Sequence, residues 1–159
     1  MNIPSSKRWR VPSGASLIQD AVFFFVIDCM RYDQWLVMEQ HLRSLYTIEK
    51  DFYMGILPTA TPYARNAIFS GYYPSEIERV FPDLWASKDD DDYSMNKYEK
   101  EFLEKLLERR RIRLRNDLKY IKIIDPEFGK QMVGNIASFI KNHLTAIVVN
   151  FVDMLLGVK

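Results

Sequence analysis

Apolar positions along this chain gather in short blocks separated by amphipathic stretches. The run at residues 21–27 is continuously apolar, which is typical of a strand buried on both faces of a parallel sheet, and another buried strand is expected at residues 145–152. Further strands are expected at residues 51–57 and 118–124. Each run is followed by a polar or proline residue, so the pattern predicts four strands with defined ends.

The stretches between these strands have the period of amphipathic helices. Helices are predicted over residues 31–46, about 62–70 and 94–111, and again after Asp125, which with the following proline makes a good start for a helix. Strands and helices therefore alternate. This alternation predicts an α/β fold with a mostly parallel sheet flanked by helices.

Two polar stretches interrupt the alternation. Residues 1–20, punctuated by Pro4, Pro12 and Gly14, are expected to form a linker or a disordered arm. Residues 71–93, with two further prolines and four consecutive aspartates, are expected to be loop.

Composition narrows the class of protein. The 159 residues are 48% apolar and 27% charged, as in a single globular domain with a real core. A formal net charge of +1 gives no overall field that would favour nucleic acid or a membrane surface. The lone Cys29 excludes a disulfide framework, and the run at 21–27 is too short for a signal or membrane span. We therefore expect a cytoplasmic protein without a membrane partner.

Candidate chemistry lies where strands end. Asp28 and Asp153 directly follow apolar runs, and Thr59 and Thr61 follow the run at 51–57. In parallel sheets, ligands bind at the carboxyl ends of strands, and carboxylates placed there can hold a divalent cation. Either aspartate alone could simply cap the next helix. Two aspartates and a threonine at one sheet edge favour a functional site.

Thr61 precedes Pro62, and this pair predicts an N-cap followed by the first helical residue. Free backbone N–H groups at such an end can bind phosphate. Arg65 lies one helical turn later on roughly the same face, and from this helix position we expect Arg65 and Asn66 to contact phosphate oxygens. A threonine is a weak nucleophile unless a base or a metal activates it. Thr61 is thus a candidate both for the helix cap and for a nucleophile.

Three motifs carry a family resemblance. The segments FVIDCMRYDQW, ILPTATPYARNAIFSGYYP and NFVDML together resemble the PglZ domain of the alkaline phosphatase superfamily. They are most similar to the PglZ output domain of PorX-type response regulators, which belong to type IX secretion in Bacteroidetes. The resemblance runs from about residue 20 to residue 155.

This resemblance implies a phosphoric ester hydrolase with a two-zinc centre. Asp28 matches the ligand of one zinc, and Asp153 matches the aspartate that opens an Asp-x-x-x-His motif for the other. Thr61, ahead of Thr59, matches the nucleophile that attacks phosphorus in line, after which water hydrolyses the phospho-enzyme. The implied substrate is a phosphate ester or a nucleotide-type compound.

The chain also departs from the family pattern. Gly157 occupies the position of the family's histidine, while His41 and His143 fall on predicted helices and are not expected to bind metal. We therefore expect residues 21–159 to be the N-terminal portion of a PglZ domain, truncated or divergent. Its partners would be the remainder of that domain, a receiver domain and a second copy in a homodimer. Alone, such a chain should bind zinc weakly and turn over little.

Two other interpretations concern the class of protein and the role of Asp28. The chain could be a non-catalytic interaction or regulatory module, because a partial sheet exposes edges that a partner can cover. Asp28 could instead be the phospho-acceptor of a receiver domain. That design needs more acidic residues after the first strand and a lysine after the last, and neither is correctly placed.

Overall fold

The computed structural model describes residues 21–85 and 96–150. The chain divides into two compact units. We call residues 18–52 and 114–159 the sheet unit, and residues 53–113, which group with residues 1–17, the helical unit. Each unit is described by itself.

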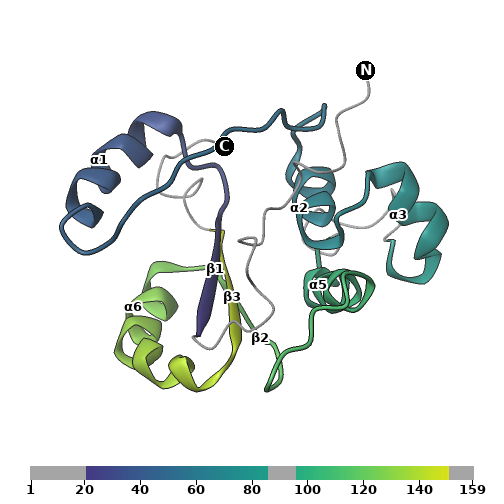
Figure 1. Cartoon of the computed structure of the whole chain (residues 1–159). Coiled ribbons are helices and arrows are strands. Elements are labelled where there is room, and N and C mark those ends of the chain that lie inside the picture. The colour runs from purple at the N-terminus through teal and green to yellow at the C-terminus, as the bar shows by residue number, and fades with distance from the viewer. Residues whose placement is uncertain (1–20, 86–95, 151–159) are drawn as a thin grey trace. The chain divides into compact units, whose positions relative to one another are not determined.

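The sheet unit contains three parallel strands among its described residues: β1 (Val22–Ile27), β2 (Lys119–Ile123) and β3 (Leu144–Val149). Their order is β1-β3-β2, and both outer strands run parallel to the central β3 (Figure 1). The helices of this unit are α1 (Tyr32–Leu42), α6 (Pro126–Asn135) and the 3₁₀ helix η4 (Ile136–Lys141). The α/β fold with a parallel sheet and flanking helices is thereby confirmed.

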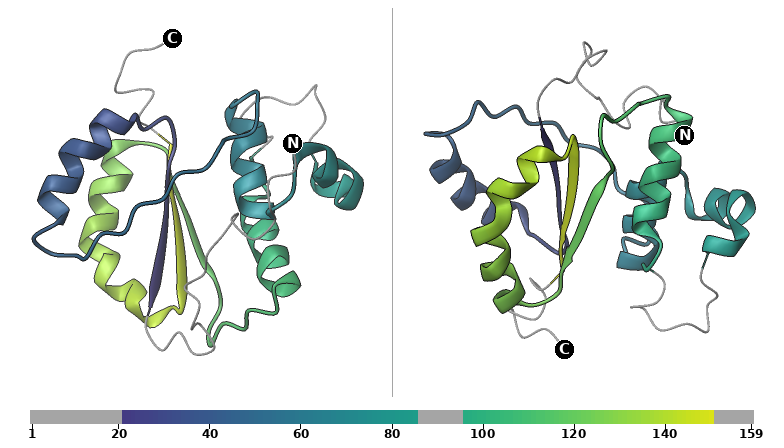
Figure 2. Two further views of the ribbon diagram at one scale, coloured as in Figure 1. Left: turned by 45° about the horizontal axis from the view of Figure 1, so that its top comes forward. Right: turned by 90° about the horizontal axis from the view of Figure 1, so that it is seen from below.

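The core of the sheet unit lies between the sheet and the α6–η4 segment. Met132 of α6 and Phe139 of η4 pack with Ile147 at the centre of β3 and with isoleucines of β2. Figure 2 shows α1 and α6 on the same side of the sheet. Asp125 caps α6 as predicted, because its Oδ1 accepts the N–H of Phe128 at 2.8 Å. The helix therefore begins where the sequence predicted.

Strands β1 and β3 differ in burial. Residues 145–148 of β3 are buried, as expected for a strand with neighbours on both sides. In β1, by contrast, no residue is fully buried and Phe25 is 50% exposed. Complete burial of residues 21–27 was therefore a wrong prediction. The physical reason is position, because β1 is an edge strand of the described sheet and pairs with β3 alone.

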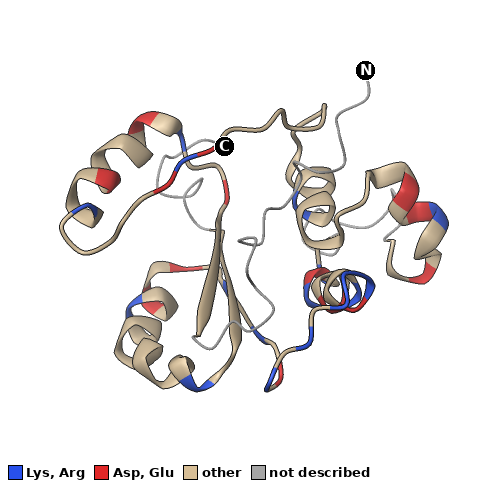
Figure 3. Cartoon of the chain, in the orientation of Figure 1, with Lys and Arg blue, Asp and Glu red and all other residues tan. Residues whose placement is uncertain are grey.

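The helical unit consists, in its described part, of α2 (Thr61–Ser70), α3 (Pro74–Val80), the 3₁₀ helix η3 (Pro82–Leu84) and α5 (Glu99–Arg109). Its core contains Phe69 of α2, Ile77 of α3 and Phe102 of α5, all fully buried. Acidic and basic positions interleave along α5 (Figure 3). This pattern suits a helix that buries one stripe and keeps the rest in solvent.

Gly71 ends α2 in the left-handed conformation, with φ of 66°. A Cβ added there would lie 2.9 Å from both Arg109 Nη2 and Leu106 Cδ1. Arg109 donates a hydrogen bond to the carbonyl of Ser70 at 2.9 Å and stacks on the Tyr72 ring. A glycine is therefore required both by the backbone angle and by the close approach of α5.

Two expectations about the middle of the chain were wrong. Residues 51–57 form no strand; Phe52, Met54 and Leu57 are 71–88% exposed, and this is where the chain passes from one unit to the other. Gly55 and the following proline both disfavour a strand there. The predicted loop at 71–93 contains α3 and η3, and α3 is started by Pro74 and by a Glu76 carboxylate that accepts the N–H of Tyr73 at 2.7 Å.

Some predictions fall outside the described residues. These are the arm at residues 1–20, the acidic run within 86–95, and Asp153 with Gly157 in residues 151–159. Within residues 21–85 and 96–150, no helix is both long and apolar enough to cross a membrane.

Candidate functional site

Asp28 stands at the carboxyl end of β1, where the sequence placed it. Its backbone N–H donates to the carbonyl of Val149 at 3.0 Å, which continues the pairing of β1 with β3 past the last strand residue. Its Oδ1 accepts the backbone N–H of Cys29 at 3.1 Å, and Cys29 has a positive φ of 56°. The chain turns sharply at this point, so the half-buried carboxylate is held at the edge of the sheet.

Thr61 is the first residue of α2 rather than its cap. The N-cap is Ala60, whose carbonyl accepts the N–H groups of Tyr63 at 3.0 Å and Ala64 at 2.9 Å. Thr61 as N-cap was therefore a wrong prediction, and the helix begins one residue earlier than expected. An alanine offers no side-chain oxygen for the free N–H groups, so α2 starts without a side-chain cap. Thr61 still lies at the positive end of the helix dipole, and Thr59 is exposed in the preceding segment.

Arg65 is engaged in a buried ion pair that the sequence reasoning missed. Its Nε donates to Glu99 Oε1 at 2.7 Å and its Nη2 to Oε2 at 2.6 Å, with side-chain exposures of 3% for Arg65 and 0% for Glu99. Asn96 Nδ2 donates to Glu99 Oε1 at 3.3 Å and to Asn66 Oδ1 at 3.4 Å. Contact of Arg65 and Asn66 with phosphate stays a prediction, while the structure gives both residues a place in this polar cluster.

A signal for Glu99 was present in the sequence. Glu99 lies three residues before Phe102 and seven before Leu106, so it falls on the apolar stripe of the predicted helix. An acid on such a stripe must find a buried partner or stay at the surface. What the sequence could not show was the partner, because Arg65 is 34 residues away.

The predicted site residues are distributed over both units. Asp28 belongs to the sheet unit and Thr61 to the helical unit, while Asp153 lies outside the described residues. In the part of the chain that the structure describes, no three or more histidine, cysteine, aspartate or glutamate side chains gather as a metal-binding group would. The zinc ligands Asp28 and Asp153 therefore stay predictions.

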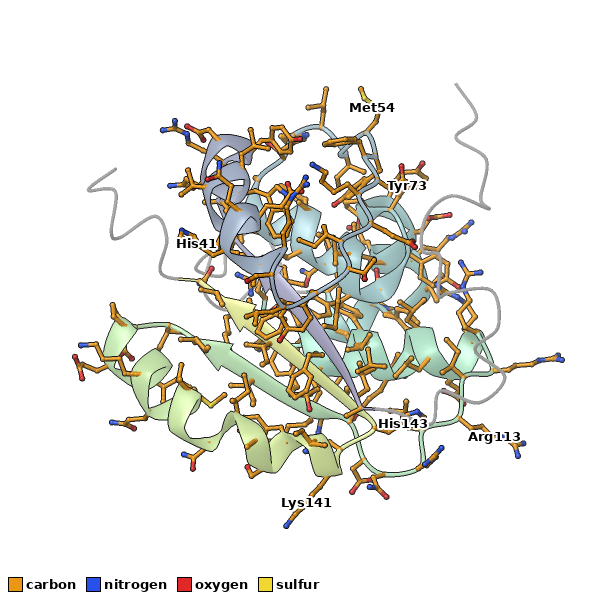
Figure 4. All side chains as sticks on the ribbon, turned by 60° about the vertical axis from the view of Figure 1, so that its left-hand side comes forward. His41, Met54, Tyr73, Arg113, Lys141 and His143 are labelled. Atoms are coloured by element: carbon orange, nitrogen blue, oxygen red, sulfur yellow. The ribbon has the colours of Figure 1, made fainter. Side chains whose placement is uncertain are left out.

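The two histidines lie in different parts of the sheet unit, and His143 stands at the end of the sheet where the strands begin (Figure 4). His41 is exposed on α1. His143 was expected on a helix, and this prediction was wrong. It lies in the turn that leads into β3, where its Nδ1 accepts the backbone N–H of Arg115 at 3.0 Å. That position is the amino end of the strand, the opposite end from Asp28.

An open cavity of about 360 Å³ lies within the sheet unit, beginning two residues after Asp28. Its aromatic walls include Tyr32 and Phe52, whose rings meet edge to face at 5.6 Å, and Trp35. The remaining lining residues are Met30, Arg31, Glu49, Lys50 and Asp51.

Two of the charged residues that line this cavity, Arg31 and Lys50, form ion pairs. Arg31 binds Asp33, and this hydrogen bond lowers the pKa of Asp33 below its usual value. Lys50 Nζ lies 2.9 Å from the buried Glu39, which Arg43 also contacts at 2.7 Å. The hydrogen bond from Lys50 lowers the pKa of Glu39 most, and the hydrogen bond from Arg43 lowers it further. Glu39 is therefore a carboxylate at neutral pH and ties the end of α1 to the segment that lines the cavity.

A parallel sheet with a carboxylate at its carboxyl edge, together with a helix that starts at a threonine, is consistent with an alkaline phosphatase-like α/β domain. Residues 15–157 match the PglZ family, described as the BREX system PglZ alkaline phosphatase-like domain, and the chain belongs to this family. A comparison with curated proteins found no match. Membership confirms the resemblance at the level of the PglZ domain and points to a hydrolase. The closer similarity to PorX-type output domains stays a prediction.

Proposed function

We propose that this chain is a zinc-dependent phosphoric ester hydrolase domain in which Thr61 is the nucleophile. The observation that carries the proposal is the family match over residues 15–157, which includes Asp28 at the end of β1 and Thr61 at the start of α2. Similarity of the same three motifs to PorX-type proteins supports a place as the cytoplasmic output domain of a two-component response regulator.

The chemistry proposed for Thr61 is the one that the family resemblance implies. In the first step the hydroxyl oxygen forms an O–P bond while the bond from phosphorus to the alcohol breaks, and the hydroxyl proton passes through solvent to the departing alcohol. Water then cleaves the O–P bond and restores the threonine. The positive end of the ten-residue α2 favours the anionic phosphate in both steps.

Asp28 and Asp153 would hold zinc, and the donor chemistry of Asp28 fits this role because zinc accepts carboxylate oxygens. When bound, the metal would neutralise charge that develops on the phosphoryl oxygens. Gly157 stands where the family's histidine is expected. With fewer side-chain ligands we expect weak zinc binding and slow turnover by this chain.

The test is hydrolysis of bis-p-nitrophenyl phosphate by the complete 159-residue chain at saturating zinc. We expect a slow rate above that of zinc alone, which is lost in Thr61→Ala and kept in Thr59→Ala. The Thr59→Ala variant is a matched control because it also removes a threonine hydroxyl, two residues before Thr61. A Thr61→Ala rate equal to that of the unmodified chain, or no rate above zinc alone, would contradict the proposal.

A second candidate function, an interaction module, is favoured by exposed apolar side chains near residue 54. Met54 is 83% exposed and Leu57 is 88% exposed, and Figure 4 shows Met54 at the surface. Two such side chains close together in the sequence present more apolar surface than a single scattered apolar residue does. If these residues bind a second copy, light scattering should show a dimer that Met54→Ser with Leu57→Ser dissociates. A chain that is monomeric and retains no partner in a pull-down would remove this candidate.

A further inference from the structure

We infer that Glu99 is a positioning residue for Thr61: its ion pair with Arg65 fixes the first turn of α2, on which the threonine stands. The inference rests on the proposed function, and it gives a role to a buried acid that the family match does not assign.

The first step concerns the start of α2. Ala60 provides no side-chain hydrogen bond to the first turn, and Pro62 has no N–H of its own. The turn is closed by the carbonyl of Ala60, which accepts from Tyr63 and Ala64. A helix end without a cap frays more easily, so another contact must set the direction of this turn.

The second step identifies that contact. Arg65 lies four residues after Thr61 and shares its helix face. Two charge-assisted hydrogen bonds, of 2.7 and 2.6 Å, join its guanidinium to the carboxylate of Glu99. A two-point pair of this kind fixes orientation as well as distance. It ties the amino-terminal half of α2 to the first residue of α5.

The third step is that the two halves of α2 are held separately. Asn96 reinforces the amino-terminal tie through both Asn66 and Glu99. At the other end, Arg109 of α5 binds the carbonyl of Ser70. Loss of the Glu99 tie should therefore release the first turn and leave the carboxyl end of the helix in place.

The experiment compares the complete chain with Glu99→Gln and with the double variant Arg65→Met, Glu99→Leu, which leaves no buried charge and so guards against a variant that cannot fold. Glu104→Gln is the matched control, because it breaks an exposed ion pair with Lys100 on the same helix. Two readouts are taken from each protein: amide hydrogen exchange along α2, and kcat and KM for bis-p-nitrophenyl phosphate.

In Glu99→Gln, the amides of Tyr63 and Ala64 should exchange about 10-fold faster or more, whereas the amide of Gly71, which donates to Ala67, should be unchanged. In both variants kcat should fall about 10-fold or more, because a small displacement of a reacting group slows the chemical step, and in Glu99→Gln, which keeps Arg65, KM should stay within about twofold. Glu104→Gln should match the unmodified chain in both readouts.

Equal acceleration of exchange at both ends of α2, or no acceleration at Tyr63 and Ala64, would overturn the inference. So would a folded double variant with unchanged kcat. Failure of the proposed function is separate and visible in the unmodified chain, as the absence of hydrolysis that depends on Thr61.

Discussion

The buried pair of Arg65 and Glu99 allows a quantitative prediction about stability. The Arg65 side chain is 3% exposed and that of Glu99 0%, so neither charge can be hydrated if its partner is removed. Removal of one partner from a buried pair costs about 3–5 kcal/mol, mostly because the other charge remains without compensation. Glu99→Leu alone should therefore lower the free energy of unfolding by about that amount.

The double variant Arg65→Met, Glu99→Leu should be more stable than Glu99→Leu, because it removes the stranded charge and fills the space with apolar atoms. The assay is urea unfolding followed by circular dichroism. It is applied to the unmodified chain, the single variants Glu99→Leu and Arg65→Met, and the double variant. These four proteins form a double-mutant cycle, and the coupling energy between Arg65 and Glu99 that it gives should be stabilising. A double variant whose destabilisation equals the sum of the two singles would refute the reasoning.

Two further outcomes are expected. Gly71→Ala should lower the free energy of unfolding by about 2–4 kcal/mol, since it adds left-handed strain to an overpacked contact with Arg109; urea unfolding measures this. Glu39→Gln should lower the melting temperature at pH 7, and the difference should vanish as the pH falls through the pKa of Glu39, which is lowered from its usual 4.5; a difference that persists at low pH would contradict the assigned cause.

The secondary structure that the sequence predicted best depends on local signals. Period and end signals together located α2 within one residue, since Gly71 can end the helix as few other residues can. The start of α6 was predicted equally well from Asp125 and its proline. Local signals did not distinguish an edge strand from a central one, because β1 and β3 are both largely apolar and differ in the number of strands beside them.

In the candidate site, too, local features could be predicted from the sequence and contacts between distant residues could not. The position of Asp28 at a strand end follows from the apolar run before it. The partner of Arg65 could not be predicted, because Glu99 is distant in sequence and meets Arg65 only when α2 packs on α5. The strand predicted at residues 51–57 was wrong for a related reason, because an apolar segment forms a strand only when a neighbouring strand is available to pair with it.

The most direct test of the central claim is to find the residue that receives the phosphoryl group. The complete chain is incubated with zinc and a phosphate monoester, quenched in acid, digested and analysed by mass spectrometry. The account predicts one phosphothreonine at Thr61, absent in Thr61→Ala and retained in Thr59→Ala. A phosphoryl group on any other residue, or turnover that leaves Thr61 unmodified at every quench time and continues in Thr61→Ala, would contradict it.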